Sequence, residues 1–137
     1  MPKGPIPAEI ADFLAKPNPS IIGTVRPDGA PVTVATWYAY DADSGRVLVN
    51  MDASRKRLSY LREDPRISLT VLADDWYSHV SLQGRVTEFS DDTDLSGIDR
   101  LSKLYTGQEY PNRTSPRVNA WIEVDRWHGW GGFKQQR

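Results

Sequence analysis

The sequence contains no cysteine, and this absence excludes several kinds of site at once. Disulfide bonds, thiolate catalysis, iron–sulfur clusters and cysteine-bound zinc all require this residue. Histidine is also scarce: only His79 and His128 occur, and neither has carboxylates at the spacing of metal ligands. We therefore expect no metal site.

An excess of charge of one sign is lacking as well. Lys and Arg number 17 against 18 for Asp and Glu, which gives a formal net charge of −1. Sequence-independent nucleic-acid binding depends on excess cations, so this balance argues against a nucleic-acid-binding barrel despite the many aromatic residues. No stretch approaches the roughly 18 apolar residues of a membrane span, and no signal peptide is visible. We expect no membrane association and a cytoplasmic protein, with a single domain over residues 1–137.

Apolar periodicity predicts a mainly β fold with short helices at the periphery. A period near 3.6 predicts helices over Pro7–Lys16 and Arg55–Glu63, and a third helix that Ser90 caps, with Asp91 and Asp92 in its first turn. A period of two predicts the strands Ser20–Arg26, Pro31–Tyr40, Arg46–Met51, Ile67–Ala73, Ser78–Phe89 and Arg117–Trp127. Six antiparallel strands joined mostly by short turns predict a closed six-stranded β-barrel, since closure removes exposed sheet edges.

The second predicted helix has an unusual charge order. Its first turn reads Ser54-Arg55-Lys56-Arg57, and its far end carries Glu63 and Asp64. Cations at a helix N-terminus oppose the helix dipole, at about 0.3–1 kcal/mol per charge. A bound anion such as a phosphate would offset this repulsion, whereas the alternative is a solvated basic turn. We expect Ser54 to cap the helix, and Arg55 and Arg57 to point outward.

At these residues the chain resembles the pyridoxamine 5′-phosphate oxidase-like superfamily, the split-barrel flavin and deazaflavin reductases. The similarity rests on the order of strands, the run from Asn50 to Arg57, and the run from Leu61 to Leu69. It implies a split β-barrel that forms a homodimer, with cofactor at the subunit interface. It also implies that Ser54, Arg55, Lys56 and Arg57 bind the cofactor phosphate, and that Asn50 and Met51 contact the ring or ribityl chain. The second strand would then lie along the ring, with Thr33, Val34, Ala35, Thr36 and Trp37.

Two cofactors fit this resemblance. The Arg55 and Arg57 pair and the Leu-Arg-Glu-Asp-Pro-Arg run most resemble the branch that uses the deazaflavin coenzyme F420; FMN is the alternative. The implied activity is hydride transfer from the reduced cofactor to an electron-poor alkene or imine of a small organic substrate. Such chemistry resides in the cofactor, so the sequence singles out no catalytic residue. An FMN-dependent oxidase or reductase, or a barrel that only binds the cofactor, is the other interpretation.

The five tryptophans leave a further choice open. Large aromatic side chains fill cores and interfaces, but they also line pockets for planar ligands. Trp76 and Tyr77 lie in a loop between two predicted strands, and Trp127-His128-Gly129-Trp130 forms a tail at the end of the last predicted strand. If the cofactor lies between subunits, Trp76 and Tyr77 of one chain would cover the cofactor of the other.

Overall fold

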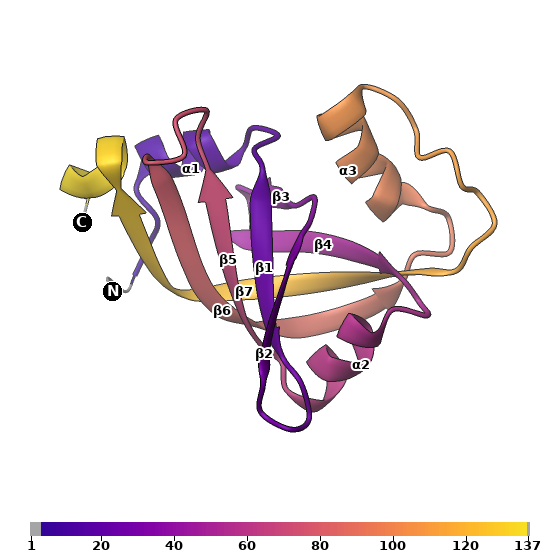
Figure 1. Cartoon of the computed structure of the whole chain (residues 1–137). Coiled ribbons are helices and arrows are strands. Elements are labelled where there is room, and N and C mark those ends of the chain that lie inside the picture. The colour runs from indigo at the N-terminus through magenta and orange to yellow at the C-terminus, as the bar shows by residue number, and fades with distance from the viewer. Residues whose placement is uncertain (1–3, 137) are drawn as a thin grey trace.

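The computed structural model describes residues 4–136, which form one seven-stranded sheet with three α-helices and a C-terminal 3₁₀ helix (Figure 1). The helices are α1 (Ala8–Leu14), α2 (Lys56–Glu63), α3 (Ser96–Thr106) and η1 (Gly131–Gln136). The strands are β1 (Ser20–Val25), β2 (Pro31–Ala35), β3 (Ala39–Asp41), β4 (Arg46–Asp52), β5 (Arg66–Leu72), β6 (His79–Asp91) and β7 (Arg117–Trp130). Among the described residues no helix is both long and apolar enough to cross a membrane.

The sheet is antiparallel throughout and open, in the order β2-β1-β5-β6-β7-β4-β3. The prediction of a closed six-stranded barrel is therefore wrong in strand number and in closure. The error lies in the predicted strand Pro31–Tyr40, which the structure divides into β2 and β3. β2 pairs with β1 and β3 pairs with β4, so the chain changes partner between Ala35 and Ala39.

This change of partner forces the sheet to curl. β2 and β3 are the two edge strands, six inter-strand spacings apart, which would be about 29 Å in a flat sheet. The connection Thr36–Tyr38 spans at most about 14 Å from Ala35 to Ala39. The two edges must therefore approach each other, and Figure 1 shows β1 and β2 crossing in front of β6 and β7.

The inner face of the curled sheet holds the core. Alternate residues of β1, β5, β6 and β7 are buried there, and α1 contributes Ile10 and Leu14. Tyr38, in the connection between the edges, is fully buried; its hydroxyl donates to the Lys16 carbonyl (3.2 Å) and accepts from Asn18 Nδ2 (2.9 Å). The connection Thr36–Tyr38, which links the two edge strands and is called the tether below, is thus anchored in the core through Tyr38.

The start of α3 differs from the prediction. β6 continues through Ser90 and Asp91, because these residues pair with β7, and the helix begins only at Ser96. Its N-cap residue is Leu95, in the left-handed region at φ 62°. The Asp92 carboxylate accepts hydrogen bonds from the backbone N–H groups of Gly97 and Ile98, both at 2.9 Å. Asp92 therefore caps the helix from outside it, and Ser90 does not.

Candidate functional site

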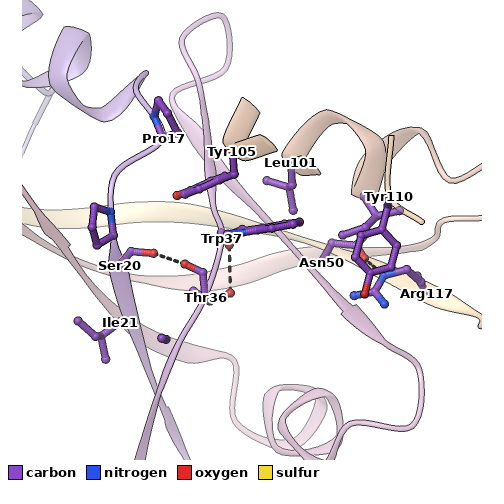
Figure 2. A pocket seen from close by; sticks show the side chains of 13 residues that line it. Pro17, Ser20, Ile21, Thr36, Trp37, Asn50, Leu101, Tyr105, Tyr110 and Arg117 are labelled. Carbon is purple, nitrogen blue, oxygen red and sulfur yellow. Dashed lines mark hydrogen bonds between the residues drawn. The ribbon is translucent and has the colours of Figure 1, made fainter. Parts of the chain in front are cut away.

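A pocket of about 640 Å³ lies between the start of β1, the tether, α3 and the first residue of β7 (Figure 2). One end is at Pro17 and Ser20, the other at Tyr110 and Arg117. The residues that line it are Pro17, Pro19, Ser20, Ile21, Ala35, Thr36, Trp37, Asn50, Ile98, Leu101, Tyr105, Tyr110 and Arg117.

Three aromatic rings form the middle of the pocket. Trp37 stacks on Tyr105, with ring centroids 5.4 Å apart and planes 14° from parallel, and the Tyr110 ring meets Trp37 edge-on at 6.3 Å. The Tyr105 hydroxyl donates to the Asn18 carbonyl at 2.7 Å, which fixes the ring. Burial raises the pKa of Tyr105 to about 12, and burial also raises that of Tyr38. Both phenols are therefore neutral near pH 7, and the pocket wall is flat and largely apolar.

The hydroxyl groups beside the tether already have partners. Ser20 Oγ donates to the Thr36 carbonyl at 2.6 Å, and Thr36 Oγ1 donates to the Trp37 carbonyl at 3.0 Å (Figure 2). These bonds hold the tether to the start of β1. Their main effect is to position the Trp37 ring, because hydroxyl groups that already donate to the protein are less available to a ligand.

The opposite end of the pocket is a polar network. Arg117 Nε donates to Asn50 Oδ1 at 2.7 Å, and the Arg117 guanidinium lies 4.8 Å from the centre of the Tyr110 ring. Asn50 is buried, and its Nδ2 donates to Asp92 Oδ2 (3.0 Å) and Asn119 Oδ1 (2.7 Å). The same Asp92 carboxylate caps α3, so Arg117 and the helix above the pocket share one set of hydrogen bonds.

The basic turn at α2 is next to this end. α2 begins at Lys56 with Arg55 as its N-cap residue, and Arg55 makes no side-chain cap. The predicted cap at Ser54 is wrong: Ser54 donates its hydroxyl (2.6 Å) and its backbone N–H (2.9 Å) to Asp52 Oδ1. Asp52 precedes Ser54 by two residues, and a short Asp side chain readily reaches the backbone N–H group two positions further along the chain.

The cations of the turn differ in exposure. Arg55 and Lys56 are exposed, whereas Arg57 is half-buried, which corrects the expectation that it points outward. Among the described residues its buried Nε has no hydrogen-bond partner. Burial, with a smaller contribution from Arg55, lowers the pKa of the Arg57 guanidinium. An unpaired buried donor of this kind is costly, and an anion would satisfy it.

Asp52 joins the turn to the pocket. Its hydrogen bonds to Ser54 are the main cause of its lowered pKa, and the charges of Arg117 and Arg55 lower it further. The Ala53 N–H also donates to the Pro116 carbonyl at 2.9 Å, next to Arg117. The charges of Arg55 and Arg117 both act on Asp52, so the basic turn and the polar end of the pocket are adjacent. An anionic group with a planar ring attached fits this arrangement of charge and aromatic surface.

The structure brings together some of the residues predicted for the cofactor site. Ala35, Thr36, Trp37 and Asn50 line the pocket, and the basic turn is adjacent to it. Thr33 lines a separate hollow, Val34 is exposed, and the Met51 side chain is buried in the core. Trp76 and Tyr77 lie in the β5–β6 loop, 71% and 53% exposed, and do not line this pocket.

Sequence reasoning missed the α3 side of the pocket and its arginine. Ile98, Leu101 and Tyr105 of α3 line the pocket, as do Tyr110 and Arg117. The one available signal was the pair Asp52 and Arg117, which are directly opposite each other across β4 and β7. Strand register would have been needed to use it.

Residues 6–131 match the family described as pyridoxamine 5′-phosphate oxidase. The chain belongs to this family. A solved F420 reductase is similar to this family member, with a TM-score of 0.78 and 23% identity over 93% of this chain and 98% of the other. A conserved hypothetical protein from Mycobacterium tuberculosis has a TM-score of 0.73 and 25% identity, covering 98% and 90%. General stress protein 26 from Bacillus anthracis has a TM-score of 0.68 and 14% identity, covering 89% and 92%. No curated protein matches the chain.

Proposed function

We propose that this protein is an oxidoreductase that transfers a hydride from reduced coenzyme F420 to an electron-poor alkene or imine of a small organic substrate. One observation carries the proposal: the basic turn at the start of α2, where the buried Arg57 Nε has no hydrogen-bond partner among the described residues, adjoins a flat aromatic pocket at the tether. A deazaflavin has the matching parts, an anionic tail and a planar ring. Membership of a family that includes oxidoreductases, and the similarity to a solved F420 reductase, agree with this.

In this proposal the basic turn holds the phosphate. Ser54, Arg55, Lys56 and Arg57 contact it, and the Arg57 Nε obtains the acceptor that it lacks. Charge-assisted hydrogen bonds of this kind are roughly twice as strong as those between neutral groups. The repulsion between the turn and the α2 dipole is then offset by the bound anion.

The ring lies along the second strand and the tether, from Thr33 to Trp37, with Asn50 beside it. Because the Met51 side chain is in the core, Met51 contributes through its backbone. When bound, the reduced coenzyme supplies the hydride, while the chain binds, orients and excludes water. Trp37, held by Tyr105 and by the bonded Thr36, provides the rigid surface for this orientation.

The proposal includes a homodimer. β2 is an edge strand with an exposed Val34, and the loop with Trp76 and Tyr77 exposes two large aromatic side chains. Exposed apolar surface of this kind marks interaction sites. Trp76 and Tyr77 of one chain then cover the cofactor bound to the other.

Replacing Trp76 by Ser should leave the monomer's stability within about 0.5 kcal/mol, because the side chain is mostly exposed. Sedimentation should show a weakened dimer, and a dimer of unchanged affinity would contradict this part.

Fluorescence titrations of the purified protein with coenzyme F420 and, separately, with FMN test which cofactor it binds. We expect tight binding of F420 and weak binding of FMN. The reverse preference would assign the protein to the FMN-dependent side of the family, and failure to bind either would refute the proposal. Mixing the reduced coenzyme with a conjugated enone then tests turnover, since a protein that only binds the coenzyme would not reoxidise it.

A charge reversal tests the basic turn. Arg57→Glu should weaken F420 binding at least about 100-fold, since it removes one charge-assisted contact and adds a repulsive charge. Arg62→Glu is the matched control, because Arg62 is on the same helix but stacks on Phe89 instead. If both variants weaken binding equally, the effect is one of net charge and the phosphate is not held at the turn.

A further inference from the structure

The pocket contains one cation, Arg117, that has hydrogen-bond donors available to a ligand. Arg117 commits Nε to Asn50, and its two Nη groups have no hydrogen-bond or ion-pair partner among the described residues. The hydroxyl groups of Ser20, Thr36 and Tyr105 and the amide of Asn50 each have an internal partner. The pocket therefore offers a ligand a single charged site, at one end of an otherwise apolar surface (Figure 2).

This guanidinium is held in a fixed orientation. Asn50 accepts from Nε on one side, and the Tyr110 ring lies against the guanidinium, 4.8 Å from its carbon. Asn50 is fixed in turn by the buried Asp92 and by Asn119. A planar guanidinium anchored through Nε keeps its two Nη groups as a fork, which matches the two oxygens of a carboxylate.

Arg117 forms no ion pair within 4.0 Å among the described residues. The charge of Asp52 interacts with it, but the two form no ion pair within 4.0 Å, and Asp52 Oδ1 is occupied by Ser54. Asp91 and Asp92 line a neighbouring hollow together with Arg117, but the Asp92 carboxylate is engaged by Asn50 and by the start of α3. A half-buried cation without a direct ion pair favours an anionic ligand over a neutral one of the same shape.

We propose that Arg117 is the specificity-determining residue of this pocket and that the substrate is a planar, largely apolar organic carboxylate. Its carboxylate binds the Nη groups of Arg117, and its flat body lies against Tyr105 on the α3 side of the pocket, which leaves Thr33 to Trp37 to the cofactor ring. That this ligand is the substrate rests on the proposed function; the preference of the pocket for a carboxylate does not.

The test compares two probes of similar shape, cinnamate and cinnamyl alcohol, by isothermal titration calorimetry on the full-length protein without coenzyme. We expect cinnamate to bind about tenfold more tightly than the alcohol, and Arg117→Met to remove this difference. Arg117→Lys, which keeps the charge but not the fork, should retain part of it. Circular dichroism confirms that each variant is folded; the Lys variant carries the test if the Met variant is not.

Arg46→Met is the matched control. Arg46 also lies over an aromatic ring, 4.7 Å from the centre of Trp121, but it does not line the pocket. We expect this variant to keep the full preference for cinnamate. Equal loss in both variants, equal binding of the two probes, or no binding of cinnamate to the wild-type protein would each overturn the proposal.

Titration of Arg117→Met with F420 separates the substrate from the cofactor. If the variant binds F420 at least tenfold more weakly but cinnamate normally, Arg117 belongs to the cofactor and the proposal is overturned. If the wild-type protein binds neither F420 nor FMN but still selects cinnamate through Arg117, the proposed function fails and the carboxylate preference stands. The two conclusions can therefore fail separately.

Discussion

The Asp92 carboxylate connects the pocket to the stability of the fold, and Asp92→Asn tests that connection. Asp92 is 3% exposed and accepts three hydrogen bonds: from Gly97 N and Ile98 N (both 2.9 Å) and from Asn50 Nδ2 (3.0 Å). Asparagine has nearly the same shape but only one acceptor oxygen. Whichever way its amide turns, its NH₂ group faces at least one of these donors.

The expected cost follows from those bonds. A hydrogen bond to a charged group contributes about 1.5–3 kcal/mol, and the replaced carboxylate loses one such bond and weakens the others. The change also removes the negative charge that offsets the N-terminal dipole of α3, at about 0.3–1 kcal/mol. We expect Asp92→Asn to lower the free energy of unfolding by about 2–4 kcal/mol, which is a fall in Tm of roughly 6–14 °C for a chain of this length.

Urea unfolding followed by far-UV circular dichroism measures this free energy. Asp91→Asn is the matched control, because the neighbouring side chain is exposed and should cost less than about 0.5 kcal/mol. A loss below about 0.5 kcal/mol for Asp92→Asn would show that the carboxylate is not needed as a cap. A loss equal to that of Asp91→Asn would lead to the same conclusion.

Two further changes test the packing and the buried phenols. Gly84→Ala should lower the free energy of unfolding by more than about 4 kcal/mol in thermal unfolding, because its Cβ would lie 1.9 Å from the Glu123 carbonyl oxygen. Gly132→Ala is the control: its Cβ would lie 3.5 Å from Ser78 Oγ, and the change should cost under about 0.5 kcal/mol. Because the pKa of Tyr105 is raised to about 12, the unfolded chain loses this proton first, and stability should fall from about pH 10 to pH 12. Tyr105→Phe should make this fall shallower in urea titrations, although Tyr38 contributes in the same sense. An unchanged slope would show that Tyr105 titrates normally.

Local pattern was enough to predict most of the elements. The alternation in β5, β6 and β7 and the apolar spacing of α1 and α2 gave strands and helices within a few residues of those in the structure, except where β6 and β7 run on. Pro31–Tyr40 failed because alternation does not record which strand a residue pairs with, and the partner changes at the tether. Ser90 failed as a cap because pairing with β7 keeps it extended. In both cases long-range pairing decided the outcome.

Predicting the pocket also required knowledge of the long-range strand pairing. Trp37 and Asn50 could be found from the family resemblance of the segments that carry them, but Arg117 becomes important only once β7 is placed against β4. Tyr105 follows the apolar spacing of a core residue, and nothing local indicates that its ring faces Trp37. The half-buried state of Arg57 also depends on tertiary packing, which the charge order of the turn does not reveal.

The tether Thr36–Tyr38 makes the pocket and the shape of the sheet interdependent. A ligand against Trp37 rests on the only covalent path between the two edge strands, so it braces those edges against separating. Residues inserted into the tether would relax the curl and widen the pocket together, whereas insertions in the turn between β3 and β4 would affect neither. Lengthening this segment is therefore a route by which related chains could change the size of the ligand they accept without rebuilding the core.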